Sequence, residues 1–327
     1  MNREISAIEA VSPEKRKTRG GGNGKTLLRR MRLNWQIYVM AIPVIVFYVI
    51  FSYVPMYGIV LAFKDYLPKD GILGSVNVGW KHFETLFANP SFSRSIKNTL
   101  VISALKLIFC FPVPVLFALL LNEFQHRKFK KAIQTMIYLP NFISWVIIGG
   151  LVRQLFATSG GMINNIITAL GGSNVPFLTK SSYFYPLLLF CEIWHSAGWG
   201  TIIYIAALSG VDPTLYEAAR IDGAKRFRLM WNISVPTILP VVVVMLLLQI
   251  GGMMNAGFDS IFNVYNKTVY DVADIIDTLV YRLGLSENNY ELSTALGLFK
   301  NVINFVLIMG ANLLAKKISG YSMYSFD

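Results

Sequence analysis

Six long apolar stretches dominate the sequence and restrict its fold more than any other feature. A helix needs about 20 apolar residues to cross roughly 30 Å of hydrocarbon. Only 15% of the residues are charged, whereas about 25% is usual in soluble domains. We therefore predict an all-α membrane protein with six transmembrane helices. The predicted spans are residues 36–63, 97–121, 135–156, 184–208, 237–258 and 294–315.

Basic residues gather in four segments that share one side of the membrane if there are six spans. These segments are the two terminal tails and the loops after the second and fourth spans. Cytoplasmic loops carry an excess of Lys and Arg, so both termini are predicted to be cytoplasmic. This accounts for the formal net charge of +12 without nucleic acid as a partner. The basic residues are Lys15, Arg16, Lys17, Arg19, Lys25, Arg29, Arg30, Arg32, Arg127, Lys128, Lys130, Lys131, Arg220, Lys225, Arg226, Arg228, Lys316 and Lys317.

We expect a basic flexible cytoplasmic tail (1–35), a transmembrane domain (36–317) and a short cytoplasmic tail (318–327). The first tail contains GGGNGKT at residues 20–26, which resembles a phosphate-binding loop. That motif requires glycine at the position of Arg19 and a preceding strand, so a Gly-rich linker is the better interpretation. No small-residue cleavage site follows the first apolar stretch, which indicates a retained anchor and not a removed signal peptide.

The loop between the fourth and fifth predicted spans, residues 211–236, carries the most informative local pattern. Asp212 can cap free N–H groups at the start of a helix, and Pro213 suits the first helical position. Gly223 is placed to end that helix. Small side chains in the helix would let another surface approach closely, so we predict a cytoplasmic docking helix. A purely structural amphipathic helix on the membrane surface is the alternative.

The spacing in this loop resembles the EAA motif, E-A-A-x3-G-x9-I-x-L-P, of binding-protein-dependent ABC importer permeases. One position departs from the motif, because Val235 stands where the motif has leucine. The segments LNEFQHRKFKKAIQTMIYLPNFIS, GGMINNIITALGG and EIWHSAGWGTIIYIAALSG resemble the carbohydrate-uptake branch of this family. The resemblance covers about residues 97–317. The matching loop residues are Glu217, Ala218, Ala219, Gly223, Ile233 and Pro236.

This resemblance implies a type I importer (MetI-like) permease fold in a bacterial cytoplasmic (inner) membrane. Such a permease is usually one half of a heterodimer, served by two ATPase subunits and an extracytoplasmic solute-binding protein. ATP and Mg²⁺ would be bound by the ATPase subunits, so no cofactor and no enzymatic activity are expected in this chain. Its function would be the import of a sugar by alternating access. The long basic N-terminus resembles the subgroup for larger saccharides, including alginate-type importers.

The resemblance also implies that the docking helix is the coupling helix that sits in a cleft of the ATPase. Closure of the ATPase pair would push on this helix and rock the spans between inward-open and outward-open states. The implied coupling residues are Glu217, Ala218, Ala219, Arg220, Asp222 and Gly223.

Polar residues inside apolar spans are expensive unless they face a cavity, so they are candidates for a substrate path. Aromatic faces and hydrogen-bonding side chains together suit a sugar. The family resemblance also places the sugar cavity among the third, fourth and fifth spans. The candidate residues are Asn141, Trp145, Glu192, His195, Trp199, Gln249, Asn255 and Asp259.

Other interpretations of these residues stay open at the level of sequence. The aromatic residues could serve packing, and Glu192 and His195 could bond to each other on one helical face. No third ligand is spaced to complete a metal site. A proton-coupled secondary carrier could use Glu192, His195 or Lys106 as a titrating group, but it leaves the EAA spacing unexplained. No catalytic constellation supports a membrane-embedded enzyme, and Cys110 and Cys191 are expected to be small core residues.

Overall fold

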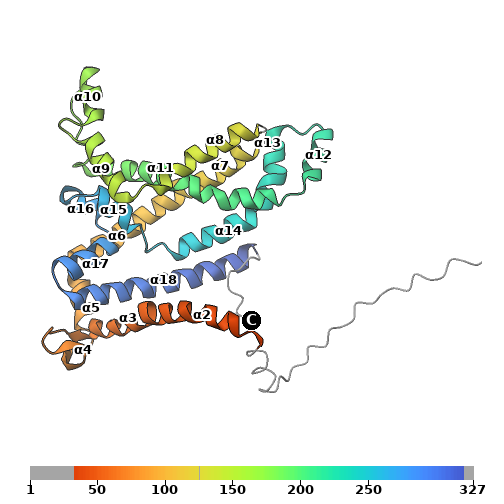
Figure 1. Ribbon diagram of the computed structural model, residues 1–327. Coiled ribbons are helices and arrows are strands. Elements are labelled where there is room, and N and C mark those ends of the chain that lie inside the picture. Colours follow the sequence, from red (N-terminus) through yellow and green to blue (C-terminus); the bar gives the residue numbers. More distant parts are fainter. Residues whose placement is uncertain (1–32, 125, 320–327) are drawn as a thin grey trace, which may run out of the picture. The chain divides into compact units, whose positions relative to one another are not determined.

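The computed structural model describes residues 33–124 and 126–319, and most of these residues are helical (Figure 1). The predicted tail up to residue 32, with its Gly-rich segment 20–26, and residues 320–327 lie outside the described residues. The chain divides into two compact units, and the first ends at Tyr57.

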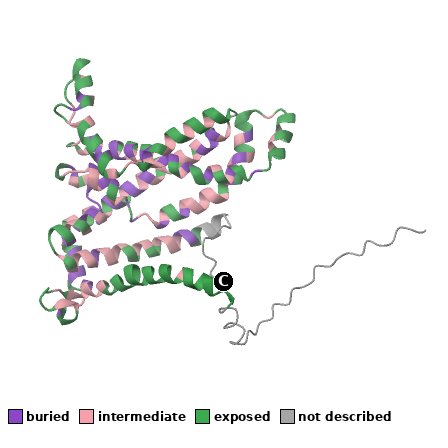
Figure 2. Ribbon diagram, in the orientation of Figure 1, coloured by how far each residue is buried: buried purple, intermediate pink, exposed green. Residues whose placement is uncertain are grey.

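The first unit contains an apolar helix that is exposed on every side. Elements α2 (Trp35–Tyr48), the π-helical η1 (Val49–Tyr53) and α3 (Val54–Met56) follow one another, and none of their residues is buried (Figure 2). A helix that is apolar all round belongs in a protein core or in a membrane. The first predicted span, residues 36–63, is therefore confirmed as a helical stretch of membrane-spanning length.

The rest of the described chain is helical apart from one small antiparallel sheet, in which Lys64 pairs with Asn77. The remaining elements, in chain order, are η2 (Tyr57–Phe63), β1 (Lys64–Asp65), α4 (Gly71–Gly74), β2 (Val76–Asn77), α5 (Lys81–Ala88), α6 (Pro90–Leu105), η3 (Lys106–Cys110), α7 (Pro112–Asn122), α8 (Arg127–Tyr138), η4 (Leu139–Phe142), α9 (Trp145–Phe156), α10 (Met162–Ala169), α11 (Ser181–Ser209), α12 (Pro213–Ile221), α13 (Arg226–Leu229), η5 (Met230–Ser234), α14 (Val235–Gly251), α15 (Phe258–Val264), η6 (Lys267–Val269), α16 (Tyr270–Ala273), α17 (Ile276–Tyr281), η7 (Arg282–Ser286) and α18 (Tyr290–Ser319).

Within the described residues, four helical stretches are long and apolar enough to cross a membrane. They are Trp35–Phe63, Pro90–Asn122, Arg226–Gly251 and Tyr290–Leu314. A bent pair of helices counts as a fifth span if its two arms are taken together. Helix α11 is 29 residues long, but Glu192 and His195 make it less apolar than the four stretches that qualify as spans. The predicted number of six spans therefore stays a prediction.

The third predicted span, residues 135–156, is wrong as a single straight helix. The stretches Arg127–Phe142 and Trp145–Phe156 meet at an angle of 94°. The backbone of Ile143 and Ser144 is extended at the break, and the Ser144 hydroxyl accepts a hydrogen bond from the N–H of Ile147. Ser144 therefore caps a new helix that points in another direction.

The fifth predicted span, residues 237–258, is shifted along the chain. The observed helical stretch begins at Arg226 and ends at Gly251. Asn255 lies in the turn that follows, and Asp259 lies in the first turn of the short helix α15. Both side chains are exposed and stand outside the spanning helix. The apolar residues of this turn, such as Met254, are buried in the protein and concealed the helix end in the sequence.

Helix α11 is packed between neighbours from both earlier and later parts of the sequence. It contacts α7, α8 and α14. Two glycines of α11 permit the close approach: a Cβ at Gly198 would overlap the carbonyl oxygen of Ile137 in α8, and one at Gly200 would lie 3.1 Å from Cγ of Pro114 in α7. Small residues at such contacts are the usual means by which membrane helices pack closely.

A hydrogen-bonded cap joins the segment between α14 and α18 to helix α6. Asp274 is completely buried and accepts two hydrogen bonds from the Arg282 guanidinium, at 3.0 and 2.7 Å. Asn98 of α6 donates to the backbone carbonyls of Asp271 and Asp274, at 3.1 Å in each case. These bonds fix the segment from α15 to η7 as a folded cap.

The contact at Gly198 generates the first prediction. Gly198→Ala should destabilise the protein by at least about 1–3 kcal/mol, because the added methyl group meets backbone that cannot move aside. Gly150→Ala in α9 is the matched control, since a Cβ there meets nothing within 4 Å. It should be neutral or slightly stabilising, because alanine favours helix over glycine by about 0.5–1 kcal/mol. The measurement is the thermal midpoint in detergent. Equal midpoints for the two variants would contradict the packing described here.

Candidate functional site

Helix α12 begins with a well-defined cap. The Oδ1 atom of Asp212 accepts a hydrogen bond from the backbone N–H of Thr214 at 2.9 Å, and Pro213 occupies the first helical position. That N–H donor lowers the pKa of the Asp212 carboxyl below its ordinary value. The predicted helix start is therefore confirmed, and its cause is the local sequence.

The same helix ends in a Schellman motif. The N–H of Gly223 donates to the carbonyl of Arg220 at 3.0 Å, and the N–H of Ala224 donates to the carbonyl of Ala219 at 2.9 Å. Gly223 has a positive φ of 77°, a conformation that glycine adopts without steric cost. A Cβ at Gly223 would meet nothing within 4 Å. The glycine is therefore required for backbone conformation and not for space.

No residue of α12 is buried. Ile221 is 87% exposed and Leu215 is 53% exposed. Of the predicted coupling residues, Ala219 is half-buried, and Glu217, Ala218, Arg220, Asp222 and Gly223 are exposed. Short helices derive most of their stability from packing, so a bare nine-residue helix with apolar side chains on its surface is suited to a partner.

Helix α12 is joined to η5 by a side-chain hydrogen bond and is separated from the end of α7 by a groove. The Tyr216 hydroxyl lies 2.9 Å from the Ser234 hydroxyl of η5, which leads directly into α14. A groove of about 300 Å³ separates α12 from the end of α7. It is lined by Asn122, Glu123, Phe124, Pro213, Tyr216, Glu217, Arg220, Arg226 and Leu229.

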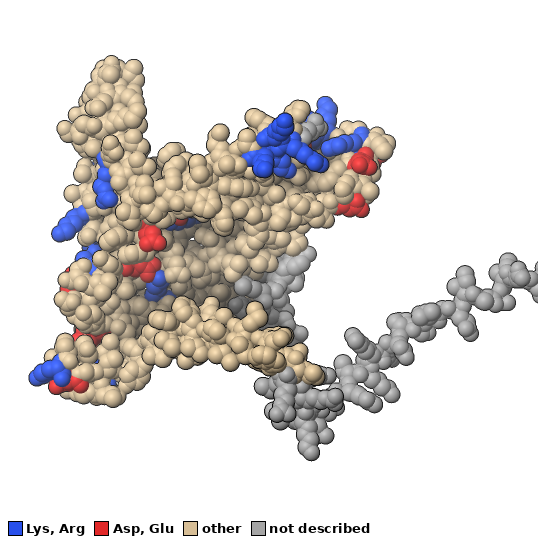
Figure 3. Space-filling model, in the orientation of Figure 1, with Lys and Arg blue, Asp and Glu red and all other residues tan. Residues whose placement is uncertain are grey.

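Lys and Arg side chains gather around this end of the second unit, over α8, α12 and α13 (Figure 3). The acidic Glu217 and Asp222 are exposed on and beside α12 itself. In this view the two described basic clusters from the sequence lie toward the same end of α11, opposite to α15 and α16 (Figure 1). This arrangement agrees with the predicted cytoplasmic placement of both loops.

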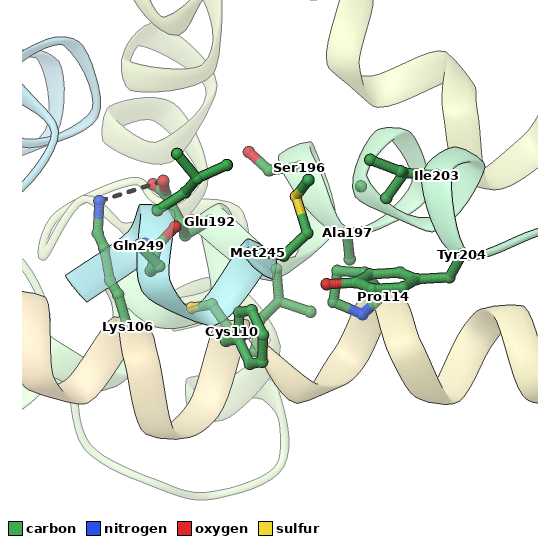
Figure 4. Close-up of a pocket in the computed structure, with 14 residues that line it drawn as sticks. Lys106, Cys110, Pro114, Glu192, Ser196, Ala197, Ile203, Tyr204, Met245 and Gln249 are labelled. Carbon is green, nitrogen blue, oxygen red and sulfur yellow. Dashed lines mark ion pairs between the residues drawn. The ribbon is translucent and has the colours of Figure 1, made fainter. Parts of the chain in front are cut away.

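A cavity of about 390 Å³ lies among η3, α7, α11 and α14 (Figure 4). Most of its lining is apolar, and its polar groups are few. It is lined by Lys106, Cys110, Phe111, Pro114, Glu192, Ile193, Ser196, Ala197, Gly200, Ile203, Tyr204, Met245, Leu248 and Gln249. A concave site with a mostly apolar wall and a few converging polar groups is typical of small-molecule binding.

An ion pair stands at one side of this cavity. The Nζ atom of Lys106 lies 3.1 Å from Oε1 of Glu192 and donates to the Ser260 hydroxyl at 3.2 Å. The Lys106 side chain is 8% exposed and that of Glu192 is 19% exposed. The Oε2 atom of Glu192 is buried and has no hydrogen-bond partner among the described residues.

The predicted path residues separate into distinct groups. Glu192 and Gln249 line the cavity. His195 turns away from Glu192: its Nε2 lies 3.2 Å from the Ile143 carbonyl, and its ring packs against Trp145 with centroids 4.6 Å apart. The sequence-level alternative of a bond between Glu192 and His195 is therefore wrong.

The other predicted path residues lie outside the cavity lining. Trp199 is 53% exposed and contacts Phe142. Asn141 lies in η4, at the bend between α8 and α9. Asn255 and Asp259 are exposed beyond the end of α14. Whether these residues meet a substrate stays a prediction.

The sequence did not indicate that Lys106 lines a cavity or that Ser260 bonds to it. In the sequence, Lys106 suggests only a titrating group of a carrier, although a lysine inside an apolar span is itself a signal of function. Ser260 gave no signal, because it lies 154 positions from Lys106 and comes near it only through the turn after α14. The cavity is built from the second, fourth and fifth predicted spans, and none of its lining residues comes from the predicted third span.

Comparison with known proteins agrees with this architecture. The family model of the binding-protein-dependent transport system inner membrane component matches residues 111–320. The polygalacturonan/rhamnogalacturonan transport system permease protein YteP of Bacillus subtilis (strain 168) is 46% identical over 321 residues, which cover 98% of each chain.

Two solved structures are similar to most of the chain. One is a bacterial ABC transporter involved in the import of the acidic polysaccharide alginate, with a TM-score of 0.82 and 39% identity over 90% of this chain and 99% of that chain. The other is a bacterial alginate ABC transporter in complex with an alginate pentasaccharide-bound periplasmic protein, with the same TM-score and identity over 91% and 99%.

The cap at Asp212 generates the second prediction. Because the folded pKa of this carboxyl is lowered, its contribution to helix stability is complete above the ordinary Asp value of about 3.9 and is lost as pH falls through the lowered pKa. Asp212→Ala should raise amide exchange in the first turn of α12 by a few-fold near neutral pH, whereas Asp212→Ser should change it little. The measurement is hydrogen–deuterium exchange of a peptide covering α12. Protection that stays the same in Asp212→Ala would show that the cap is dispensable.

Proposed function

Because the chain belongs to the family of binding-protein-dependent transport system inner membrane components, we propose that it is the permease of an ATP-driven importer for oligosaccharides from acidic polysaccharides. The chain is a multi-pass inner-membrane subunit of an ABC transporter. Neither the matched family nor the relatives support the proton-coupled carrier that the sequence left open.

The substrate class follows from the relatives taken together. The YteP permease is named for polygalacturonan and rhamnogalacturonan, and the solved neighbour imports alginate. These polymers share uronic acid units, which carry a carboxylate and several hydroxyls. A chain 46% identical to one such permease and 39% identical to the other is best explained by a cargo of the same class.

The exposed, doubly capped helix α12 is the observation that carries the coupling part of the proposal. A helix with no buried residue and with Leu215 and Ile221 on its surface is suited to a partner, and its resemblance to the EAA spacing supports an ATPase subunit as that partner. We infer that Glu217, Ala218, Ala219, Arg220 and Asp222 contact the ATPase and that Gly223 closes the helix. ATP and Mg²⁺ would be held by the ATPase subunits, so this chain needs no cofactor and no metal of its own.

Movement of α12 can reach the cavity through a short route. Tyr216 bonds to Ser234, and η5 continues into α14, which supplies Met245, Leu248 and Gln249 to the cavity wall. A push on α12 would therefore tilt α14 against α11 and alter the cavity. The cavity among η3, α7, α11 and α14 is the proposed part of the translocation path that this chain provides.

The remaining partners are a second permease subunit, homologous but different, two ATPase subunits and an extracytoplasmic binding protein. A periplasmic protein holds the saccharide in the alginate complex, which supports the last of these. The membrane lipid surrounds the apolar helices, and no nucleic acid is involved.

The third prediction tests this function directly. The purified transporter complex in proteoliposomes should take up labelled trigalacturonate only when ATP is inside and the binding protein is outside. Substituting a proton gradient for ATP should give no uptake, because coupling runs through the ATPase. The measurement is vesicle-trapped label over time, with neutral maltotriose as the comparison saccharide. Proton-driven uptake without ATP would overturn the proposal.

The fourth prediction concerns the end of α12. Gly223→Val should lower binding-protein-stimulated ATP hydrolysis and uptake, because the left-handed backbone costs a side chain about 1–2 kcal/mol and β-branching adds to that cost. Gly223→Asn is the matched control, since asparagine tolerates this conformation better than other side chains. It should retain most of the coupling. Equal coupling in the two variants, with equal amounts in the membrane, would argue against a role for this turn.

A further inference from the structure

The ion pair of Lys106 and Glu192 supplies the only charges among the residues that line the cavity. Lys106 lies at the start of the π-helical turn η3, and Glu192 lies in the middle of α11. Charged residues within membrane helices are expensive and commonly mark a transport path. Their pairing makes this wall of the cavity neutral overall (Figure 4).

The hydrogen bonds of this pair are incomplete. Lys106 directs its ammonium group at Glu192 Oε1 and the Ser260 hydroxyl. Ser260 in turn donates to the Gly257 carbonyl at 3.0 Å, so its hydroxyl can only accept from Lys106. The second carboxylate oxygen, Oε2 of Glu192, is buried without a donor. An ionised carboxylate accepts several hydrogen bonds, and a buried acceptor left unpaired is costly.

What the site lacks is therefore a hydrogen-bond donor that brings no charge of its own. The hydroxyl group of a sugar is such a donor. The cavity volume of about 390 Å³ falls within the range of roughly 300–1,000 Å³ for small-molecule sites. Phe111 and Tyr204 contribute aromatic side chains to the lining, which suit the C–H faces of a sugar ring. The last torsion of a glutamate is soft, so a turn of the carboxylate can present Oε2 to the cavity.

We propose that Glu192 is a hydroxyl-binding residue of the saccharide path and that Lys106 and Ser260 are its positioning residues. This inference rests on the proposed function and deepens it. A lone lysine in the cavity would hold an acidic saccharide too tightly for passage, and a lone glutamate would repel it. The pair avoids both effects, because Lys106 neutralises Glu192 while Glu192 keeps one oxygen available for sugar hydroxyls.

The test is uptake of trigalacturonate by the whole complex, with the half-saturating concentration and the maximal rate measured separately. The neutral double variant Lys106→Met/Glu192→Gln should raise the half-saturating concentration about tenfold, because a charge-assisted hydrogen bond is lost. The single variant Glu192→Asp should raise the half-saturating concentration less than this double variant does, since it keeps a carboxylate on the same helix. The Glu192→Gln single variant leaves Lys106 without a counter-charge, so it should lower both the half-saturating concentration and the maximal rate.

The charge-swapped variant Lys106→Glu/Glu192→Lys separates the inference from a merely structural pair. It keeps an ion pair between η3 and α11 but moves the carboxylate to the wrong helix, so uptake should stay impaired. The matched control is Lys300→Met/Asp277→Asn, which removes a second pair of low exposure that lies outside the cavity lining. It should leave the half-saturating concentration unchanged.

The outcomes distinguish a failure of the proposed role of Glu192 from a failure of the proposed import function. Absence of ATP-driven uptake by the wild-type complex would overturn the proposed function and this inference with it. If the wild-type complex takes up trigalacturonate and either the neutral double variant or the charge-swapped variant does so equally well, only this inference is overturned. Neutral isosteres can replace a purely structural buried pair without loss. Complex assembly, checked by size-exclusion chromatography, removes variants that fail to fold.

Discussion

The close packing of α11 against α7 and α8 determines where the cavity lies and which residues reach it. Gly198 and Gly200 allow the backbones to approach at this contact. Side chains on the neighbouring turns of α11 are thereby held against η3 and α14. Glu192 meets Lys106, and Tyr204, which also lines the cavity, packs with Leu119 and Ile238 in a core cluster. Association of membrane helices depends on packing and hydrogen bonds more than on the hydrophobic effect, so these small residues have a large influence.

Within the second unit, helix α12, which would receive force from the ATPase, is separate from the helices around the cavity, which would face the substrate. Helix α12 is exposed, capped by local sequence at both ends and attached through a single side-chain bond to η5. The cavity wall is made by long helices with buried contacts. Continuity of η5 with α14 joins the two parts without an intervening loop. A rigid connection of this kind transmits a displacement, whereas a flexible linker would absorb it.

The bilayer explains why polar groups are so restricted in this chain. Every backbone group in hydrocarbon must find a partner within the protein, and the break between α8 and α9 satisfies this requirement through the Ser144 cap. In the cap between α14 and α18, Asn98 does the same, since it donates to the backbone carbonyls of Asp271 and Asp274. Among the described residues, two buried side-chain atoms have no hydrogen-bond partner, Arg94 Nε and Glu192 Oε2, and of these two residues only Glu192 lines the cavity. An unpaired acceptor on a residue that lines a cavity supports the proposed hydroxyl-binding role of Glu192.

The sequence by itself determined those features whose causes are local. The length of an apolar stretch gave the long helices, and Asp212, Pro213 and Gly223 gave both ends of α12, since each cap is made by residues next to one another in the chain. Only the tertiary structure decided that Glu192 pairs with Lys106 and not with His195, that the third span bends by 94°, and that Asn255 and Asp259 fall beyond the end of α14. The physical reason is that helical periodicity states which residues share a face, but the partner of that face is chosen by packing between segments far apart in the chain.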